Sequence, residues 1–548
     1  MNRIEKTARR ELPVLSNRPA PLPLAGAAGL RVGLITLGCD KNTVDSERIL
    51  AGLVGAGARV ADDGDDADVV IVNTCGFIEM AKEESIDAIL EAVRMKEEGR
   101  TRAVVAMGCL VQRYKDELSA EIPEVDLFLG LTEVDRLIPE LRARGLLATP
   151  PPDFVPTMER PLRVLSTATP HTSFLKISEG CDHSCAFCAI PLMRGKHRST
   201  PIDVLVREAQ ELEASGVVEL NIVSQDTTWY GRDWARGQAP ERGDNGFFVG
   251  RLVGANGRGA GGGFAGTAAL PGTVGGALGA GAGGVAGLPG VTGVAGAPGR
   301  SPLPGDTTLP GVSRYGALPE LLRALLDSTG IPWFRLFYMY PSGIRPELVE
   351  LIASEPRILP YLDMPIQHGS DAVLERMRRP ERRATILERV RWLREAIPGV
   401  VLRTTVIVGF PGETEEDFEA LLELLEEVRF DRVGAFEYSV EEGTPAATMP
   451  DQVPPEVRRE RMERLLDVQR AITFEKNEAW VGREVEALVD EGPDEDGVAI
   501  GRTAGQAYDV DGVVHLHGSA GLEPGRFVRA RITDAEEYDL IGEVIGSV

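Results

Sequence analysis

The sequence is poor in positive charge, in aromatic residues and in long hydrophobic runs. Its 548 residues carry 59 Lys and Arg against 84 Asp and Glu, which gives a formal net charge of −25. A surface of this sign gains nothing by releasing the counterions of nucleic acid, so we expect no stable nucleic-acid binding and favour a basic partner. No run approaches the roughly 18 apolar residues of a membrane span, which predicts a soluble protein with no membrane partner.

Cysteine is also scarce, and the start of the chain carries no pattern typical of an export signal. Residues 1–29 hold scattered charges and several prolines, and Pro21 and Pro23 interrupt the most apolar stretch. We therefore predict a disordered leader and a cytoplasmic protein. The six cysteines then stay reduced, and their even number indicates metal binding or catalysis sooner than a disulfide framework.

Residues 30–150 predict an N-terminal α/β domain with a parallel sheet. Helical patterns at 45–54 and 79–93 separate short apolar runs, and strands that alternate with helices at this spacing pair in parallel. The apolar runs are Val32–Leu37, Val69–Val72, Ala103–Met107 and Leu127–Leu129.

Residues 168–476 predict a second α/β domain. Helical patterns again separate the strand-like runs, which indicates a partial (β/α)6 barrel with its chemistry at the carboxyl ends of the strands. The runs are Phe174–Ile177, Val217–Val223, Phe334–Met339, Tyr361–Ile366, Leu402–Val408 and Val433–Tyr438. A Gly-rich segment at about 240–316 interrupts this domain and is predicted to be a disordered insertion, because Gly250 to Gly316 contains 23 glycines and few side chains to bury.

The end of the chain predicts a long helix over 456–477 and then a small all-β domain over 477–548. Short strand-like runs of this number are typical of a five-stranded, OB-like barrel. Residues 480–548 hold five Arg, no Lys and fifteen Asp and Glu, so the basic footprint for a phosphate backbone is missing. The fold class is thus multidomain α/β plus small all-β, and the last five runs are Val485–Val489, Val498–Arg502, Val513–His517, Phe527–Ile532 and Leu540–Ile545.

Cys181, Cys185 and Cys188 form a C-x3-C-x2-C run directly after the first barrel strand. Three thiolates from one loop can hold a four-iron cluster and leave one iron open for a small molecule. The alternative is a structural zinc site completed by a histidine, although such sites usually come as paired spacings. The candidate histidines are His183, His171 and His197.

The other three cysteines, Cys39, Cys75 and Cys109, each follow a predicted parallel strand by two or three residues. Parallel strands end on one side of a sheet, so the three thiols should converge on the crevice where α/β folds bind ligands. Gly38, Gly76 and Gly108 would let the backbone approach closely. Singly, each cysteine is more often a small buried hydrophobe; as a set they predict a second three-thiolate cluster.

At these residues the chain resembles the radical S-adenosylmethionine (SAM) methylthiotransferases, over nearly everything from Arg31 to Val548 except the Gly-rich insertion. The resemblance implies two 4Fe-4S clusters and SAM as cofactors. It implies that one cluster, on Cys181, Cys185 and Cys188, binds and splits SAM, and that the other, on Cys39, Cys75 and Cys109, carries the sulfur. It also implies that the last domain is a TRAM domain, which holds the substrate.

Shorter segments that resemble the family less specifically imply further residues that line the SAM pocket. They are Phe187, Arg194, Gln225, Asp226, Gly409 and Gly412. Gln225 and Asp226 stand where relatives often carry Gly-Gly-Glu. The Gly-Phe-Pro-Gly turn at 409–412 is equally a routine strand-to-helix connection, and His368 is as readily a satisfied core histidine as a site residue.

Two branches of the family compete, one modifying an adenosine of tRNA and one modifying a ribosomal protein. The segments 37–42, 72–79 and 180–191 resemble the ribosomal branch, whereas the tRNA branch more typically shows Met-Asn after its first cysteine. The match implies that the substrate is an aspartate β-carbon in small-subunit ribosomal protein S-twelve, converted to 3-methylthioaspartate, with an electron donor protein as a further partner. The acidic charge independently favours this basic substrate over tRNA.

Overall fold

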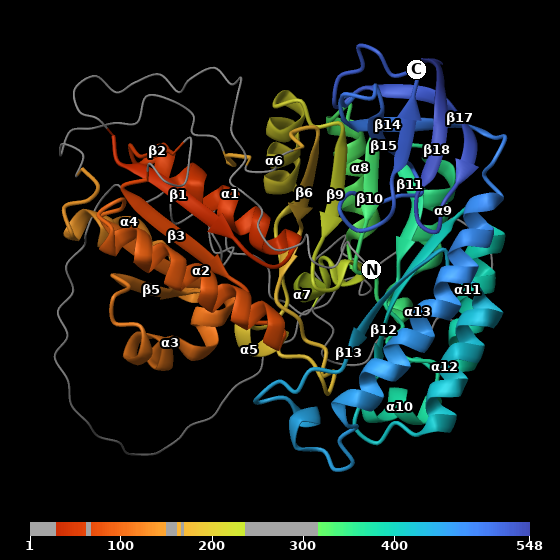
Figure 1. Cartoon of the computed structure of the whole chain (residues 1–548), viewed down its shortest axis with the longest axis horizontal. Helices are drawn as coiled ribbons and strands as arrows, with labels where there is room; N and C mark the ends of the chain where they lie inside the picture. Colours follow the sequence, from red (N-terminus) through yellow and green to blue (C-terminus); the bar gives the residue numbers. More distant parts are fainter. Residues whose placement is uncertain (1–28, 62–66, 149–161, 166–168, 236–315) are drawn as a thin grey trace, which may run out of the picture.

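The computed structural model describes residues 29–61, 67–148, 162–165, 169–235 and 316–548. Three bodies are visible in Figure 1: an N-terminal domain, a larger domain built on a curved sheet, and a small barrel at the C-terminus. The predicted leader at 1–29 and the predicted insertion at about 240–316 fall almost entirely outside the described residues. Among the described residues, no helix combines the length and the apolar character needed to cross a membrane.

The N-terminal domain is a five-stranded parallel sheet in the order β2-β1-β3-β4-β5. The predicted parallel sheet is confirmed, and the sequence missed only its two-residue edge strand. Alternate residues of β3 face opposite layers, because Val69 and Ile71 pack with α1 and α4 whereas Val70 and Val72 pack with α2 and α3. The elements are β1 (Arg31–Thr36), α1 (Asp40–Gly55), β2 (Arg59–Val60), β3 (Val69–Thr74), α2 (Glu79–Glu97), β4 (Ala103–Gly108), α3 (Cys109–Glu121), β5 (Leu127–Gly130) and α4 (Leu137–Ala143).

The second domain is a six-stranded parallel sheet in the order β13-β12-β11-β10-β9-β6, which confirms the partial barrel. Along β12 the buried residues alternate with half-buried ones. Leu402, Val406 and Val408 belong to the core under the helices, whereas Arg403 lies on the opposite face and forms an ion pair with Asp363 of β11 at 2.7 Å. The strands are β6 (Thr172–Lys176), β9 (Glu219–Val223), β10 (Trp333–Leu336), β11 (Ile358–Asp363), β12 (Val401–Val408) and β13 (Arg432–Glu437).

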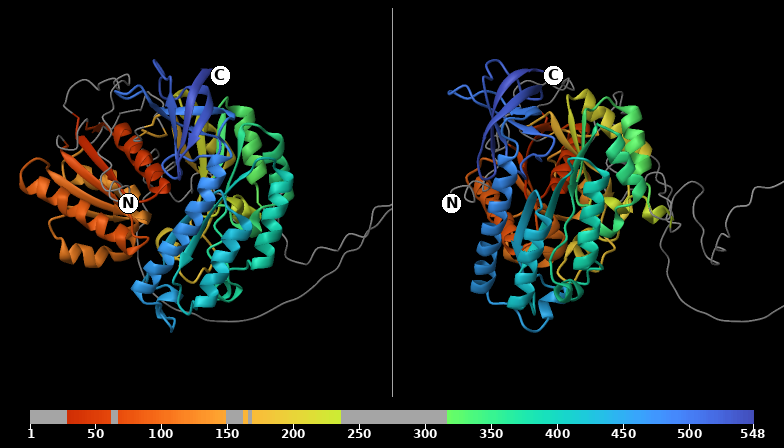
Figure 2. Two further views of the ribbon diagram at one scale, coloured as in Figure 1. Left: turned by 45° about the vertical axis from the view of Figure 1, so that its right-hand side comes forward. Right: turned by 90° about the vertical axis from the view of Figure 1, so that its right-hand side faces the viewer.

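Helices between these strands cover the outside of the sheet, as the turned views of Figure 2 show. Two short strands pair with each other next to the cysteine loop. The helices and short strands are β7 (Ser178–Glu179), α5 (Ile190–Arg194), β8 (Arg198–Ser199), α6 (Ile202–Ala214), α7 (Arg232–Ala235), α8 (Leu318–Ser328), α9 (Pro346–Ser354), α10 (Asp371–Arg376), α11 (Arg383–Ala396), α12 (Glu415–Val428) and α13 (Pro455–Glu478).

The C-terminal domain is a closed barrel of five strands, as predicted. It packs against the amino ends of the second domain's strands: Arg502 of β15 contacts Glu219, the first residue of β9, at 2.7 Å, and Phe527 of β17 contacts Trp333, the first residue of β10. The barrel also reaches the middle of two strands, where Arg335 of β10 donates to the carbonyl oxygen of Ala504 and Tyr361 of β11 donates to Asp511, each at 2.8 Å. Its strands are β14 (Glu484–Glu491), β15 (Ala499–Thr503), β16 (Val514–His517), β17 (Phe527–Ala535) and β18 (Leu540–Ser547).

Buried ion pairs join the N-terminal domain to the second domain. Arg48 of α1 pairs with Glu208 of α6 at 2.7 Å, and both side chains are at least 95% buried. Asp45 of α1 pairs with Lys176 at the end of β6 and with Arg194 of α5. Breaking a buried ion pair is strongly destabilising, and separating the two domains would break several such pairs at once.

Candidate active site

Cys39, Cys75 and Cys109 lie at the carboxyl ends of β1, β3 and β4, which are neighbours in the sheet. Cys39 is the N-cap residue of α1, and Cys109 is the first residue of α3. A Cβ on Gly38 would stand 2.7 Å from the Sγ of Cys75, which shows how closely the first two loops approach each other. The structure thus places the three predicted residues together at the carboxyl ends of three neighbouring strands.

Two glycines make this approach feasible. Gly38 has a φ of +88° and Gly108 a φ of +108°, in the left-handed region that glycine tolerates best. A Cβ on Gly108 would lie 2.5 Å from Asn73 Oδ1 and 2.6 Å from the carbonyl oxygen of Thr74. Any other residue there would push β4 away from β3 and would move Cys109 out of the site.

Asn42, in the first turn of α1, ties the three strand ends together. Its fully buried side chain donates hydrogen bonds to the carbonyl oxygens of Leu37, at 2.8 Å, and Thr74, at 3.1 Å. Its Oδ1 accepts from the thiol of Cys109 at 3.8 Å. One amide therefore holds the residue after β1, the end of β3 and the start of α3.

The environment of these thiols favours their neutral form. Burial, together with the nearby Cys39, raises the pKa of Cys75 to about 12. Burial also raises the pKa of Cys109 to about 11, although Arg194 acts in the opposite direction. A metal bound here has to displace the protons of these thiols, so its binding is coupled to pH.

The second set of cysteines lies on the loop between β7 and α5. Gly180, with a φ of +73°, turns the chain immediately before Cys181 and packs on the backbone of Lys196. The amide of His183 donates to the Sγ of Cys181 at 3.4 Å, and Cys188 N donates to the carbonyl oxygen of Cys185 at 3.2 Å. Ala186, between Cys185 and Cys188, also bonds through its backbone to Met377 and Ala446, so both local and remote contacts shape this loop.

Tyr340 and Arg379 pack against Cys185 from the loop after β10 and from the segment after α10. The Tyr340 hydroxyl lies 3.9 Å and the Arg379 Nη1 lies 4.0 Å from the Cys185 Sγ, and the guanidinium stacks over the tyrosine ring at 3.7 Å. Burial raises the pKa of Cys181 and of Cys188 to about 12. All six cysteines are free.

The histidines considered for a zinc site have other partners. His183 Nε2 lies 2.7 Å from Asp226 Oδ2, His171 Nε2 lies 3.0 Å from Asp490 Oδ1, and His197 Nε2 lies 3.1 Å from Ser199 Oγ. Within the part of the chain that the structure describes, no group of three or more His, Cys, Asp or Glu is placed to hold a single metal ion.

Three of the predicted SAM-pocket residues flank the cysteine loop. Asp226, after β9, accepts hydrogen bonds from Thr228 N at 2.9 Å and also contacts His183 of the loop. Gln225 has buried amide atoms that make no hydrogen bond in the described structure. Phe187 packs against an apolar cluster at the end of β12 that includes Phe410. An unsatisfied amide beside the cysteine loop is the observation expected of a ligand pocket.

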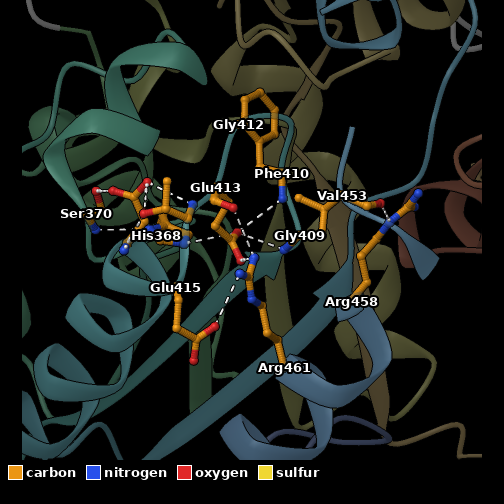
Figure 3. Close-up of polar contacts among 12 residues, drawn as sticks. His368, Ser370, Gly409, Phe410, Gly412, Glu413, Glu415, Val453, Arg458 and Arg461 are labelled. Carbon is orange, nitrogen blue, oxygen red and sulfur yellow. Dashed lines mark hydrogen bonds and ion pairs between the residues drawn. The ribbon is translucent and has the colours of Figure 1, made fainter. Parts of the chain in front are cut away.

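The turn after β12 is built around Glu413, as Figure 3 shows. The Glu413 carboxylate accepts from the amides of Gly409, at 2.8 Å, and Phe410, at 3.1 Å, and from Arg461 of α13 at 2.8 Å. Gly409 and Gly412 have φ values of +73° and +76°. His368 is fully buried, with Nδ1 accepting from Ser370 N and Nε2 3.3 Å from Glu413, so it is a core histidine here.

Arg194, predicted at the SAM pocket, makes its contacts across the domain joint. Its guanidinium donates to Asn42 Oδ1 at 2.6 Å, to Asp45 at 3.1 Å and to Glu179 at 2.7 Å. Alongside it, Ala189 and Met193 pack directly on Cys109. The five-residue helix α5, which begins two residues after Cys188, thereby connects the two sets of cysteines.

The two sets of residues fit two four-iron clusters. Each offers three free thiols on loops shaped by glycine, and three thiolates can bind three different irons of one cluster. A cluster bound by three cysteines supplies an iron with no protein ligand, where a small molecule can bind and electrons can be delivered. The thiol of Cys109 contacts Asn42, which in turn binds Arg194. The thiol of Cys185 contacts Tyr340 and Arg379.

Three sequence signatures match the chain. One described as "Uncharacterized protein family UPF0004" covers residues 31–130, one described as "Radical SAM superfamily" covers 312–425, and one described as "TRAM domain" covers 481–545. They fall on the N-terminal sheet, on strands β10 to β12, and on the C-terminal barrel.

Curated relatives match over almost the whole length. A protein of Anaeromyxobacter sp. (strain Fw109-5) is 44% identical, covering 94% of each chain. One of Symbiobacterium thermophilum is 41% identical over 96% of this chain and 94% of the other. One of Geobacter sulfurreducens is 39% identical over 94% of this chain and 98% of the other. All three are named "Ribosomal protein uS12 methylthiotransferase RimO".

A solved structure of the radical SAM methyltransferase TsrM from Kitasatospora setae, with cobalamin and a [4Fe-4S] cluster bound, is 14% identical with a TM-score of 0.47, covering 76% of this chain and 77% of that chain. The family follows from the curated relatives, which combine high identity with nearly complete coverage. The chain belongs to the RimO family of radical SAM methylthiotransferases.

Proposed function

We propose that this chain attaches a methylthio group to the β-carbon of an aspartate in ribosomal protein uS12, giving 3-methylthioaspartate. The relatives' printed name supports the substrate, and one structural observation supports the chemistry: two sets of three cysteines, on separate domains, are held together through α5. A reaction that activates a C–H bond at one site and delivers sulfur from another needs two such sites at a fixed separation.

In this proposal Cys181, Cys185 and Cys188 hold the 4Fe-4S cluster that binds SAM, and Cys39, Cys75 and Cys109 hold the cluster that carries the sulfur. If SAM is bound at the first site and reduced there by one electron, it would provide a radical able to remove hydrogen from the substrate carbon, and a second SAM would provide the methyl group. The predicted SAM contacts are the buried amide of Gln225, Asp226, the backbone of Phe187 and the turn at Gly409 and Gly412; Arg194 stays a prediction for this pocket.

The remaining parts of the proposal concern partners and place. The chain acts in the cytoplasm, on uS12 either free or within the small ribosomal subunit, and receives electrons from a donor protein. We assign residues 30–150 to the sulfur-delivering domain, 168–476 to the radical SAM domain and 477–548 to the TRAM domain. Stable binding of nucleic acid is not part of the function, because the net charge of −25 repels phosphate.

The test is to purify the protein without oxygen, count its iron and sulfide, and incubate it with SAM, a reductant, and either small ribosomal subunits or tRNA. Mass spectrometry should find one hydrogen replaced by a methylthio group on an aspartate of uS12 and no change in tRNA. Modification of tRNA alone would refute the proposal. A preparation that needs only one cluster for methylthiolation would refute the assignment of two sites.

A further inference from the structure

Five large hydrophobic side chains are exposed around the cysteine sites, and we call them the mouth patch. Their exposed fractions are 42% for Phe77, 73% for Met80, 52% for Leu192, 51% for Phe436 and 47% for Val440. Phe77 follows Cys75 by two residues, and Leu192 lies in α5, four residues after Cys188. The other exposed large hydrophobic residues of the described chain occur elsewhere, in the N-terminal domain, α13 and the C-terminal barrel.

Contacts between their neighbours show that these side chains belong to one region. The guanidinium of Arg113 donates to the carbonyl oxygens of Gly76, at 3.0 Å, and Glu442, at 2.9 Å, and to the carboxylate of Glu441, at 2.9 Å. It thus links the residue before Phe77 to the residue after Val440. A Cβ on Gly443 would lie 3.1 Å from a methyl carbon of Leu192.

The mouth patch lies at the carboxyl ends of the strands, where the thiols are. Phe436 is near the end of β13, which is an edge strand of the six-stranded sheet, and Phe77 follows the end of β3. Figure 1 shows the start of α2, helix α5 and the segment after β13 on the same side of the molecule, away from the C-terminal barrel. A substrate that reaches the thiols from this side has to pass over the mouth patch.

The charges around the mouth patch are acidic. Glu79, with 67% of its side chain exposed, precedes Met80, and Glu437 and Glu442 are exposed next to Phe436 and near Val440. The two cations beneath it, Arg113 and Lys82, are buried and both paired with Glu441. Glu79 is also paired with Lys82, at 2.9 Å, but stays exposed. An apolar surface bordered by exposed carboxylates suits a basic protein and repels phosphate.

We propose that the mouth patch is the docking surface for the protein substrate, a basic ribosomal protein, and that it guides the segment carrying the target residue to the thiols. This inference rests on the proposed function. It assigns substrate docking to a surface formed by the N-terminal domain and the second domain, whereas the C-terminal barrel packs at the amino ends and along the middle of the strands.

The test compares Met80→Ser and Val440→Ser, singly and together, with Leu90→Ser and Val510→Ser. The last two change side chains that are 40% and 49% exposed but lie outside the mouth patch. With small ribosomal subunits as substrate, we expect the double variant to raise the KM for methylthiolation about tenfold or more. Iron content and SAM cleavage without substrate should stay unchanged, and the two control variants should keep the wild-type KM.

A second experiment tests whether the acidic charge around the mouth patch contributes to substrate binding. Glu442→Lys should raise the KM for small subunits, and added salt should reduce that difference, because exposed charges are screened. A KM that is unchanged in every mouth-patch variant would overturn the docking inference, as would a KM that Glu442→Lys lowers. Variants that change the oligomeric state in place of KM would assign the mouth patch to a second copy and would also overturn it. A wild-type enzyme that modifies no ribosomal protein would instead refute the proposed function, before any variant is compared.

Discussion

The two cysteine sites are built in opposite ways. Cys181, Cys185 and Cys188 come from one loop within eight residues of each other, and remote segments brace that loop through the backbone of Ala186. Cys39, Cys75 and Cys109 come from three strand ends and meet only because β1, β3 and β4 pair in register. The first site therefore depends on a short sequence, and the second depends on the folding of a whole domain. Their responses to mutation should differ accordingly.

The largest effects are expected for the cysteines themselves. Cys185→Ala should abolish SAM cleavage and methylthiolation, because the cluster that binds SAM loses a ligand. Cys75→Ala should abolish methylthiolation and spare SAM cleavage, since the site of Cys181, Cys185 and Cys188 in the second domain keeps all its ligands. Both are measured by following 5′-deoxyadenosine and the modified protein. If the two variants behave alike, the two roles assigned here are wrong.

The next largest effect is expected for Asn42, whose side chain holds the three strand ends of the N-terminal site together. Asn42→Ala removes the side chain that binds Leu37 O, Thr74 O and Arg194, and the buried groups left without partners should cost about 3–5 kcal/mol of stability. We expect iron bound by the N-terminal cysteines to fall while SAM cleavage persists. Spectroscopy of the two clusters checks this, and equal loss of both clusters would contradict it.

A smaller effect separates backbone strain from close packing. Gly108→Ala should lower the free energy of unfolding by about 3 kcal/mol, because its Cβ would collide with β3. Gly57→Ala is the matched control: its φ is +101°, in the same left-handed region, but a Cβ there meets nothing within 4 Å. Denaturant unfolding should give about 1 kcal/mol for the control. If both variants lost the same free energy of unfolding, backbone strain alone, and not the collision with β3, would account for the effect of Gly108→Ala.

The smallest effect at neutral pH concerns the joint with the C-terminal barrel. Burial opposes ionisation of Glu219, yet Arg502 and Arg335 lower its pKa to about 2 from the model-compound value of 4.5. A lowered carboxyl pKa contributes stability above pH 4.5 that is lost as the pH falls towards 2, here about 3 kcal/mol.

Arg502→Gln should raise the pKa of Glu219 and move acid unfolding to higher pH, while SAM cleavage at neutral pH persists if the fold is retained. Thermal unfolding followed across the acid range measures this. Arg526→Gln, at an exposed arginine of the same domain, is the control and should leave the acid midpoint unchanged. A midpoint that moves equally in both variants would show that net charge, and not Glu219, sets it.

Much of the fold could be predicted because apolar runs mark buried strands. Every predicted strand of the two sheets is present, with ends shifted by a few residues. The missed strand, Arg59–Val60, has two residues and no apolar pattern that could mark it. The convergence of Cys39, Cys75 and Cys109 was also predictable, since it follows from strand order alone.

The supporting residues could not be predicted in the same way. Arg194 reaches Asn42 and Asp45 from about 150 residues away in the chain, and no local pattern pairs them. The partners Arg48 and Glu208 are similarly remote, and charged residues are usually exposed. Only the three-dimensional structure shows that these side chains are buried and join two domains.

The buried charges between α1, β6 and α5 bear on how the protein works. Because Asp45, Lys176 and Arg194 would each lose a partner if the domains moved apart, a hinge at this joint is disfavoured. The joint then acts as a fixed frame that holds the two sets of cysteines at a constant separation.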